Sequence, residues 1–401
     1  MSCSSRLREV LDVALPNADI LAGRVDDASA PVWSDARGWT AFLLALDEAS
    51  LRHAEAHGLG RVLATSADAP ISLRSLEGDV ARVTALPRLS ASSALSAEAL
   101  RSVKLRKRAQ LEGLLAAVSG MAREAERIVD VGAGSGHFTR LSAELFQRQA
   151  LGLERNPARV AAASERAGAG VRFEVADATR RLELASSDLA IGLHACGELG
   201  DSLTQTAGEA RCDLALVSCC LQKISSDVRR PLSRVAARAE LRKEHLGLSN
   251  LTAQPRGVEE TIEVTLAARQ TRYALGLLLR ERGVRVAPGA EMSGINRRRA
   301  NAGLAEVATL ALAQRGLPPA STAELVYCSE LAARDYARIR RLSLPRSMLA
   351  RLVEVLVSLD RAAHLEEQGQ QVLVAAPFDR AISPRNIGIF ASRSLSRLPA
   401  A

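Results

Sequence analysis

The chain has 401 residues, of which 47% are hydrophobic, 24% charged and 3% aromatic. No apolar run approaches the roughly 20 residues that cross a bilayer, and the first residues lack the apolar stretch of a signal peptide. We therefore expect a cytoplasmic protein without a membrane segment, whose six cysteines are reduced thiols, and the net charge of +8 is compatible with a polyanionic partner such as RNA.

Residues 1–98 form a separate region with a weak pattern. The pattern predicts one helix over 40–57 and short strands at 62–64 and 71–73. The Ser- and Ala-rich stretch 90–96 is typical of a boundary, so we expect the region to end there. Its sequence does not indicate a role.

From residue 99 to 225, strand and helix patterns alternate at short intervals after a basic helix that begins near Arg101. The predicted strands are 128–131, 150–154, 171–176, 187–194 and 213–220, and the predicted helices between them are 137–149, 157–167 and 199–209. This alternation is typical of a parallel sheet with helices on both faces.

The alternation stops at residue 225. Residues 226–345 are helical in pattern, polar and basic, without a strong strand signal, and we interpret them as an insertion. In the last part, 346–401, a helix over 347–368 precedes two apolar runs at 371–377 and 387–392. These runs would complete a seven-stranded, mostly parallel sheet with an antiparallel C-terminal hairpin.

The first strand ends within residues 129–139 in a glycine turn that opens onto a helix, as in nucleotide-cofactor sites. The glycine spacing differs from the dinucleotide pattern G-x-G-x-x-G, and an acid stands two residues before the first glycine. An acid suits the α-ammonium of S-adenosylmethionine (SAM), and bare backbone suits close approach of the cofactor. The residues that would contact SAM here are Asp130, Gly132, Ala133, Gly134 and Gly136. The alternative is a turn whose glycines serve packing alone.

Two further acids stand at the ends of neighbouring predicted strands. Glu154, after the second strand, would accept hydrogen bonds from both ribose hydroxyls, and Asp177, after the third, would accept one from the adenine amino group. Each acid alone is also explained as a surface carboxylate or a helix cap. Together with the C-terminal hairpin, they predict the α/β fold of a class I, Rossmann-like SAM methyltransferase.

The fourth strand ends in Gly-Leu-His194-Ala-Cys196-Gly197 instead of the Asn/Asp-Pro-Pro-aromatic motif of many amino methyltransferases. His194 would lie beside both the cofactor and the approaching acceptor, where an imidazole can take or position a proton. We treat His194 and Cys196 as the candidate catalytic residues. The alternative for His194 is a buried side chain hydrogen-bonded at the strand end.

The fifth strand ends in Ser218-Cys219-Cys220-Leu221-Gln222-Lys223. If this strand neighbours the fourth, its cysteines lie near His194 and Cys196. A histidine with three cysteines is able to bind a metal, but the zinc spacing is missing, so we expect no metal and interpret the thiols as pocket lining. The candidate substrate contacts are Cys219, Cys220, Gln222 and Lys223.

Five segments resemble a single family of methyltransferase domains. They are Lys104–Leu111, Val129–His137, Leu193–Leu199, Ser218–Gln222 and Phe378–Asn386. The family includes the glutathione S-transferase C-terminal-domain-containing protein and the methyltransferase-like proteins once named for a ribosomal RNA adenine dimethylase domain. The His-x-Cys-Gly segment is also similar to that of a eukaryotic tRNA 2′-O-methyltransferase. The resemblance covers roughly 100–225 and 345–395.

The resemblance implies a SAM-dependent methyltransferase. The three glycines of the turn match the family's cofactor loop, and His194, Cys196, Gly197, Cys219 and Cys220 match its strand-end motifs. The chain has Leu221 where other members have an aromatic residue after the Cys-Cys pair, so any stacking by that ring is in doubt here. The family's names point towards RNA, but a name by analogy does not assign a substrate.

Four basic runs bear on an RNA substrate: Lys104–Arg108, Arg229–Lys243, Arg297–Arg299 and Arg338–Arg341. Each alone is also compatible with a solvated helix face, and few aromatic rings are present to stack on bases. Our hypothesis is methyl transfer to ribosomal or transfer RNA, with the N-terminal region and the insertion flanking the acceptor. The alternatives are a protein or small-molecule methyltransferase, or a SAM-binding scaffold without catalysis. The sequence does not indicate an oligomeric state.

Overall fold

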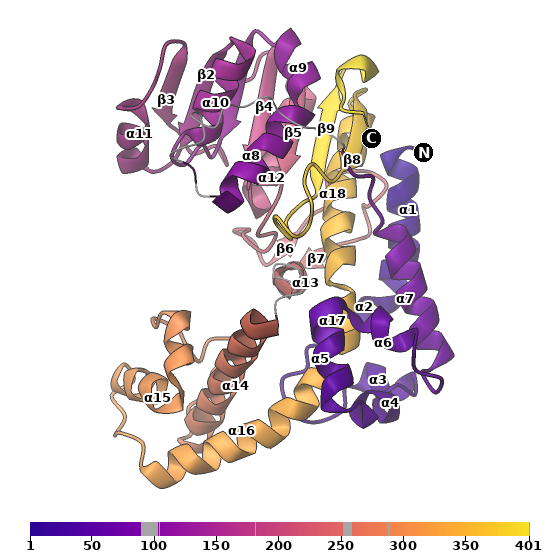
Figure 1. Ribbon diagram of the computed structural model, residues 1–401, viewed down its shortest axis with the longest axis vertical. Helices are drawn as coiled ribbons and strands as arrows, with labels where there is room; N and C mark the ends of the chain where they lie inside the picture. The colour runs from indigo at the N-terminus through magenta and orange to yellow at the C-terminus, as the bar shows by residue number, and fades with distance from the viewer. Residues whose placement is uncertain (90–102, 104, 181, 252–258, 288, 401) are drawn as a thin grey trace. The chain divides into compact units, whose positions relative to one another are not determined.

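A computed structural model describes residues 1–89, 103, 105–180, 182–251, 259–287 and 289–400 (Figure 1). By its contacts the chain divides into two units. The first contains Met1–Ala18, Asp79–Ala253 and Leu349–Ala401, and the second contains Asp19–Gly78 and Gln254–Met348. Part of the predicted N-terminal region and most of the predicted insertion thus belong to the same unit.

The first unit is built on a seven-stranded sheet in the order β3-β2-β1-β4-β5-β9-β8. The strands are β1 Arg127–Val131, β2 Gln149–Glu154, β3 Val171–Val175, β4 Asp188–Leu193, β5 Asp213–Val217, β8 Gln371–Ala375 and β9 Gly388–Ser392. The first five are parallel, and β9 pairs antiparallel with both β5 and β8. The predicted fold class, including the C-terminal hairpin, is confirmed.

The two central strands explain why the sequence signal was strong. In β5 every residue is buried, and in β4 only the last is partly exposed. Parallel strands covered on both faces have continuous apolar sequences, and these two do. In the edge strand β3 no residue is fully buried, and Arg172, Glu174 and Val175 are exposed.

Helices complete the first unit. They are α1 Cys3–Ala14, α8 Leu105–Ala117, α9 Ser119–Glu124, α10 His137–Phe146, α11 Pro157–Ser164, α12 Gly197–Ala210, α13 Lys243–Leu248 and α18 Ala350–Glu367, with short 3-10 turns at Leu15–Asn17, Ser249–Leu251 and Leu395–Arg397. α18 is buried along most of its length because α1, α12 and β8 pack against it. A two-stranded sheet, β6 Val228–Arg229 and β7 Leu241–Arg242, lies where we expected no strand. Each of its strands has two residues, which is too short to show the alternation of apolar and polar residues that predicts a strand.

The second unit is helical. It contains α2 Ala18–Ala22, α3 Val32–Ala36, α4 Thr40–Ala45, α5 Glu48–His57, α6 Leu59–Leu63, α14 Glu259–Glu281, α15 Leu304–Ala313, α16 Thr322–Leu342, α17 Leu344–Met348 and the 3-10 helix Arg297–Ala302. Its two chain segments are joined by Arg340, which donates to Glu48 and Glu55 at 2.8 and 2.7 Å. α7, Ile71–Val83, crosses the boundary between the units.

Three local predictions were wrong. The helix expected over 40–57 is two helices, because the carboxylate of Asp47 accepts from the N–H of Ser50 and starts a new helix. The strands expected at 62–64 and 71–73 are parts of α6 and α7. In α7 the buried residues recur at helical spacing over 73–83, a period that a three-residue window misses.

The boundary expected within 90–96, with the limit at residue 98, lies outside the described residues, as does the start of the basic helix. Among the helices that the structure describes, none is both long and apolar enough to cross a bilayer.

Candidate functional site

The glycine turn follows β1 and leads into α10, as predicted. Gly132, Gly134 and Gly136 have φ values of 79°, 60° and 69°, in the left-handed region that favours glycine. A Cβ on Gly136 would lie 2.4 Å from the ring of Phe173, whereas a Cβ on Gly134 would meet nothing closer than 3.9 Å. Packing therefore explains the glycine at 136, but it does not explain the one at 134.

Asp130 lies buried beneath this turn. One of its carboxylate oxygens accepts a hydrogen bond from the Thr139 hydroxyl at 2.6 Å. Burial raises the pKa of Asp130 to about 6, against the opposing effects of the Thr139 hydrogen bond and the charge of Lys107. At neutral pH the group is largely ionised, so a negative charge stands below the turn. Its contact with a SAM ammonium stays a prediction.

The raised pKa predicts a pH dependence of stability. The unfolded carboxyl ionises near 3.8, so between about pH 4 and pH 6 the folded protein holds an extra proton. The stability from this group is fully present below pH 4 and is lost as the pH rises through 6. We expect Asp130→Asn to gain about 3 kcal/mol relative to wild type between pH 4 and pH 8, measured by urea unfolding. Parallel curves for Asp130→Asn and wild type would contradict the assignment.

The two predicted ribose and adenine acids stand at the ends of β2 and β3. Glu154 is buried and accepts from the N–H of Gly134 at 3.1 Å and of Asn156 at 3.0 Å, so it is tied directly to the glycine turn. Asp177 is exposed and accepts from the hydroxyl and the N–H of Thr179, and these hydrogen bonds lower its pKa. Because β1, β2 and β3 are parallel neighbours, their ends share one edge of the sheet.

His194 directly follows β4 with a φ of 69°, which is uncommon for a residue other than glycine. Its side chain is exposed, not buried as the alternative held, and Nε2 lies 3.1 Å from Oε1 of Gln110. Gln110 is a buried residue of α8 that the sequence reasoning did not single out. Gln110 lies within Lys104–Leu111, one of the five segments that resemble the family, but no feature of the sequence predicts its contact with His194.

The turns after β4 and β5 are joined. The strands are parallel neighbours, and a disulfide connects Cys196 and Cys219, whose Cα atoms are 5.2 Å apart. The expectation of reduced thiols is therefore wrong for this pair, because adjacent strand ends bring the sulfurs into bonding range. The bond leaves Cys196 without the thiol that a catalytic role needs. Cys220 has a free thiol.

The remaining candidate substrate contacts, Gln222 and Lys223, follow the two cysteines in the turn after β5. A Cβ on Gly197 would lie 2.1 Å from the carbonyl oxygen of Lys223, and the N–H of Glu198 donates to that oxygen. The Lys223 backbone is thus held against the start of α12, while its side chain is exposed. Oε1 of Gln222 is buried and has no hydrogen-bond partner among the described residues.

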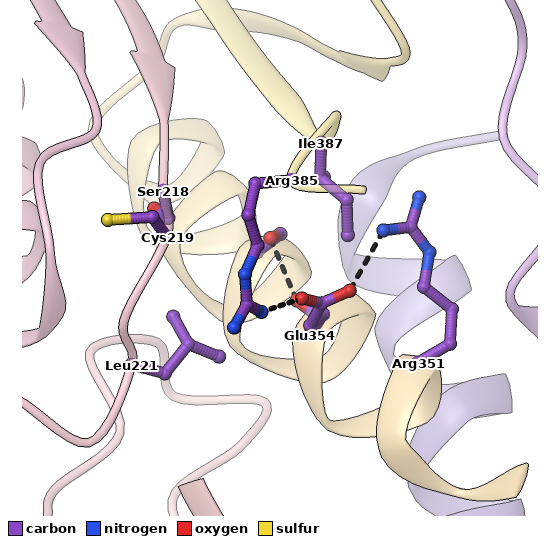
Figure 2. A pocket seen from close by; sticks show the side chains of 8 residues that line it. Ser218, Cys219, Leu221, Arg351, Glu354, Arg385 and Ile387 are labelled. Atoms are coloured by element: carbon purple, nitrogen blue, oxygen red, sulfur yellow. Dashed lines mark hydrogen bonds and ion pairs between the residues drawn. The ribbon is translucent and has the colours of Figure 1, made fainter. Parts of the chain in front are cut away.

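A small pocket opens beyond the end of β5 (Figure 2). One wall is Ser218, Cys219 and Leu221; the others are Arg351, Glu354 and Ser358 of α18, and Arg385 and Ile387 before β9. Glu354 accepts from Arg351 at 2.9 Å and contacts Arg385, so one carboxylate faces two guanidinium groups. Arg385 lies in a segment of the resemblance, whereas Arg351 and Glu354 were not singled out.

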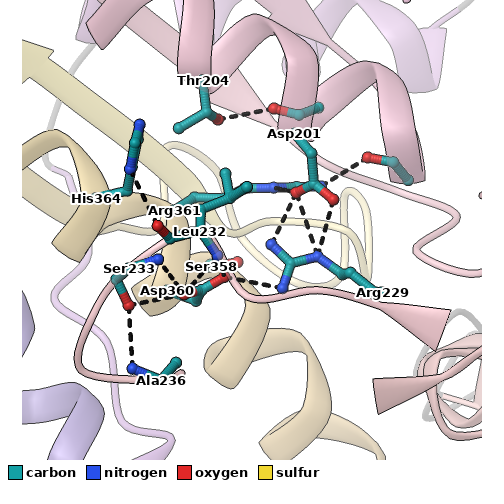
Figure 3. A network of polar contacts seen from close by, with 12 residues as sticks. Asp201, Thr204, Arg229, Leu232, Ser233, Ala236, Ser358, Asp360, Arg361 and His364 are labelled. Carbon is teal, nitrogen blue, oxygen red and sulfur yellow. Dashed lines mark hydrogen bonds and ion pairs between the residues drawn. The ribbon is translucent and has the colours of Figure 1, made fainter. Parts of the chain in front are cut away.

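A buried network of two arginines and two aspartates supports both turns (Figure 3). Arg361 of α18, fully buried, donates to Asp201 at 2.8 Å, to the carbonyl oxygen of Gly197 at 2.8 Å and to Ser218 at 2.5 Å. Arg229 pairs with Asp201 and Asp360, each at 2.8 Å. Burial opposes ionisation of Asp201, but the charges of Arg361 and Arg229 lower its pKa.

Residues 106–227 match the model of a family described as a methyltransferase domain. A comparison with curated proteins finds no match. Among solved structures, the sugar N-methyltransferase KedS8 from Streptoalloteichus sp ATCC 53650 is similar at 21% identity and a TM-score of 0.25, over 30% of this chain and 51% of that chain. SAM-bound CalS10 from Micromonospora echinaspora, an amino pentose methyltransferase involved in calicheamicin biosynthesis, has 21% identity and a TM-score of 0.24, over 30% and 52% of the two chains.

A geranyl diphosphate methyltransferase in complex with GPP and sinefungin has 16% identity and a TM-score of 0.24, over 42% of this chain and 66% of that chain. The similarity to KedS8 and CalS10 spans about half the length of those two structures. The family match covers β1 to β5 with the strand ends described above. Residues 106–227 are thus similar to a methyltransferase domain.

Proposed function

We propose that the chain transfers the methyl group of SAM to a nucleophilic atom in ribosomal or transfer RNA. The observation that carries the enzymatic part is the glycine turn with Glu154 bound to it. Gly134 keeps an open side and an N–H that Glu154 orients, which a turn built for packing alone does not require.

Bound SAM supplies an electrophilic methyl group, and its sulfur keeps the electron pair when the methyl leaves. The chain's own residues would align the acceptor with that methyl in a site that excludes water. Asp130, the glycine turn, Glu154 and Asp177 would hold the cofactor along one edge of the sheet. His194, exposed at the end of β4, would take or position the proton that the acceptor loses.

The choice of RNA rests on charge near the site. Not every predicted basic residue is available, since Arg229 is buried in the network and Arg340 is paired with Glu48 and Glu55. The segment 230–243, however, exposes five cations: Arg230, Arg234, Arg238, Arg242 and Lys243, of which Arg234 is paired with Glu367. This segment follows β5 in the same unit. The residues just before it are held against the start of α12, because Ser225 donates two hydrogen bonds to Glu198. Phosphate groups are the natural partner of such a segment.

The test is transfer from labelled SAM into a cell lysate, divided into RNA, protein and small-molecule fractions. We expect label in the RNA fraction only, and none with Gly134→Arg. With purified RNA, Arg230→Gln/Arg238→Gln should raise KM at least tenfold and reduce the salt slope of binding by about 2, because two phosphate contacts are lost.

A matched double variant, Arg61→Gln/Arg285→Gln, removes the same charge from exposed positions in the other unit and should leave both values unchanged. Label confined to protein or small molecules would replace RNA by that acceptor class. Measurable SAM binding without transfer into any fraction would favour a scaffold.

A further inference from the structure

Three sulfur atoms meet where the two central strands end. Cys196 and Cys219 are joined, and the Sγ atoms of Cys196, Cys219 and Cys220 all lie within 4.8 Å of one another. The proposed transfer of a methyl group uses none of them. A bonded pair with a third sulfur in reach is the arrangement that thiol–disulfide exchange requires, since exchange proceeds by attack of one thiolate on a disulfide sulfur.

These three cysteines differ from the rest of the set in exposure. Each is partly exposed, whereas Cys3, Cys212 and Cys328 are buried. Burial raises the pKa of both Cys3 and Cys212 to about 12, so these thiols are not reactive at neutral pH. Reactive sulfur in the described part of the chain is therefore concentrated at the ends of β4 and β5.

The two bonded sulfurs are not equivalent. Cys196 is the N-cap residue of α12, a helix of 14 residues, and its side chain makes no capping hydrogen bond. The helix dipole stabilises a thiolate at this position. Cys196 is thus the better leaving group, and an external thiolate is directed to the Sγ of Cys219.

We propose that Cys196, Cys219 and Cys220 form a thiol–disulfide exchange site, in which the Cys196–Cys219 bond is reversibly reduced by a dithiol and Cys220 is the alternative partner of Cys196. A reductant thiolate attacks Sγ of Cys219, the S–S bond breaks, and Cys196 leaves with the electron pair and is protonated. The second thiol of the reductant then displaces Cys219. Two electrons and two protons pass to the protein, and the reductant becomes a disulfide.

The exchange changes the hydrogen bonding of the candidate catalytic turn. The Sγ atoms of Cys196 and Cys219 lie 3.1 and 3.5 Å from the carbonyl oxygen of His194. As thiols both are able to donate to this oxygen, whereas disulfide sulfurs have no proton to donate. The oxidation state therefore alters the hydrogen bonding of the His194 carbonyl oxygen, whatever the methyl acceptor is.

The experiment measures the oxidation state of the cysteines and not methyl transfer, so its result does not depend on the proposed function. The full chain is equilibrated in mixtures of reduced and oxidised dithiothreitol, quenched in acid, unfolded, alkylated with N-ethylmaleimide and mapped by mass spectrometry. We expect Cys196 and Cys219 to change together from under 10% to over 90% alkylated across the series. Cys3, Cys212 and Cys328 should be alkylated throughout.

Single variants test the role of each sulfur. Cys219→Ser should form a Cys196–Cys220 disulfide, Cys220→Ser should keep the Cys196–Cys219 bond, and Cys328→Ser should behave as wild type. Glutathione should form its mixed disulfide at Cys219 at least fivefold more than at Cys196.

The proposal is overturned if Cys196 and Cys219 are alkylated in every mixture, or in none of them. A free Cys196 thiol in oxidised Cys219→Ser removes Cys220 from the site. About one equivalent of zinc or iron in the isolated protein, lost in Cys220→Ser, would show a metal site instead, because a metal needs the three sulfurs as thiolates.

Discussion

The Gly134→Arg variant is expected to lose affinity for SAM by at least a hundredfold while keeping its fold. Gly134 has a φ of 60°, so an arginine there is strained by about 1–2 kcal/mol. Its Cβ meets no atom closer than 3.9 Å, so the neighbouring chain does not have to move. The long side chain would then occupy the open side of the turn, where the proposal puts the cofactor.

Equilibrium dialysis with labelled SAM measures the affinity, and circular dichroism with thermal unfolding checks the fold. The matched control is Gly170→Arg, since Gly170 lies in the same unit, has a φ of 76° and would also accept a Cβ without contact. Both variants should lose similar stability, but only Gly134→Arg should lose SAM. Wild-type affinity in a folded Gly134→Arg protein would remove the turn from the cofactor site.

His194→Asn is expected to lower kcat by about a hundredfold to a thousandfold, with SAM affinity within twofold of wild type. Asparagine suits this position because it tolerates a positive φ better than alanine does, so the backbone at 69° is kept and only the imidazole is lost. Single-turnover transfer measures the chemical step. A proton-transfer role further predicts partial recovery of the rate on addition of free imidazole.

Gln110→Leu is the control for positioning, because it removes the partner of Nε2 and leaves the imidazole in place. It should lower the rate less than His194→Asn does, and imidazole should not restore it. An unchanged kcat in His194→Asn would exclude His194 from the reaction.

Much of the sheet was predictable because its information is local. Four of the first five strands are mainly apolar runs between turns, and each of the five strands predicted from 128 to 220 overlaps an observed one. Parallel strands place their carboxyl ends at one edge, so residues after different strands converge without any knowledge of side-chain contacts. The positions of Glu154, Asp177 and His194 after their strands followed from this rule.

The remainder depends on contacts between distant segments. Asp360 and Arg361 are consecutive in a helix, and such residues are mostly exposed in proteins, yet here they are buried against Arg229 and Asp201. No spacing rule connects residue 361 to residue 201. The Cys196–Cys219 bond was not predicted for another reason. The two strands were expected to be neighbours, but reduced thiols are the usual state in a cytoplasmic protein, so no bond was expected.

The strand order shows that the residues matched by the methyltransferase family model do not include the whole sheet. The match ends at residue 227, but β5 has its second neighbour in β9, which begins at Gly388. Expressed as a fragment, 106–227 would present the bare edge of β5, a template for aggregation, and would leave Asp201 without Arg361. The family match therefore ends inside the folded sheet, because the second neighbour of β5 lies at Gly388–Ser392.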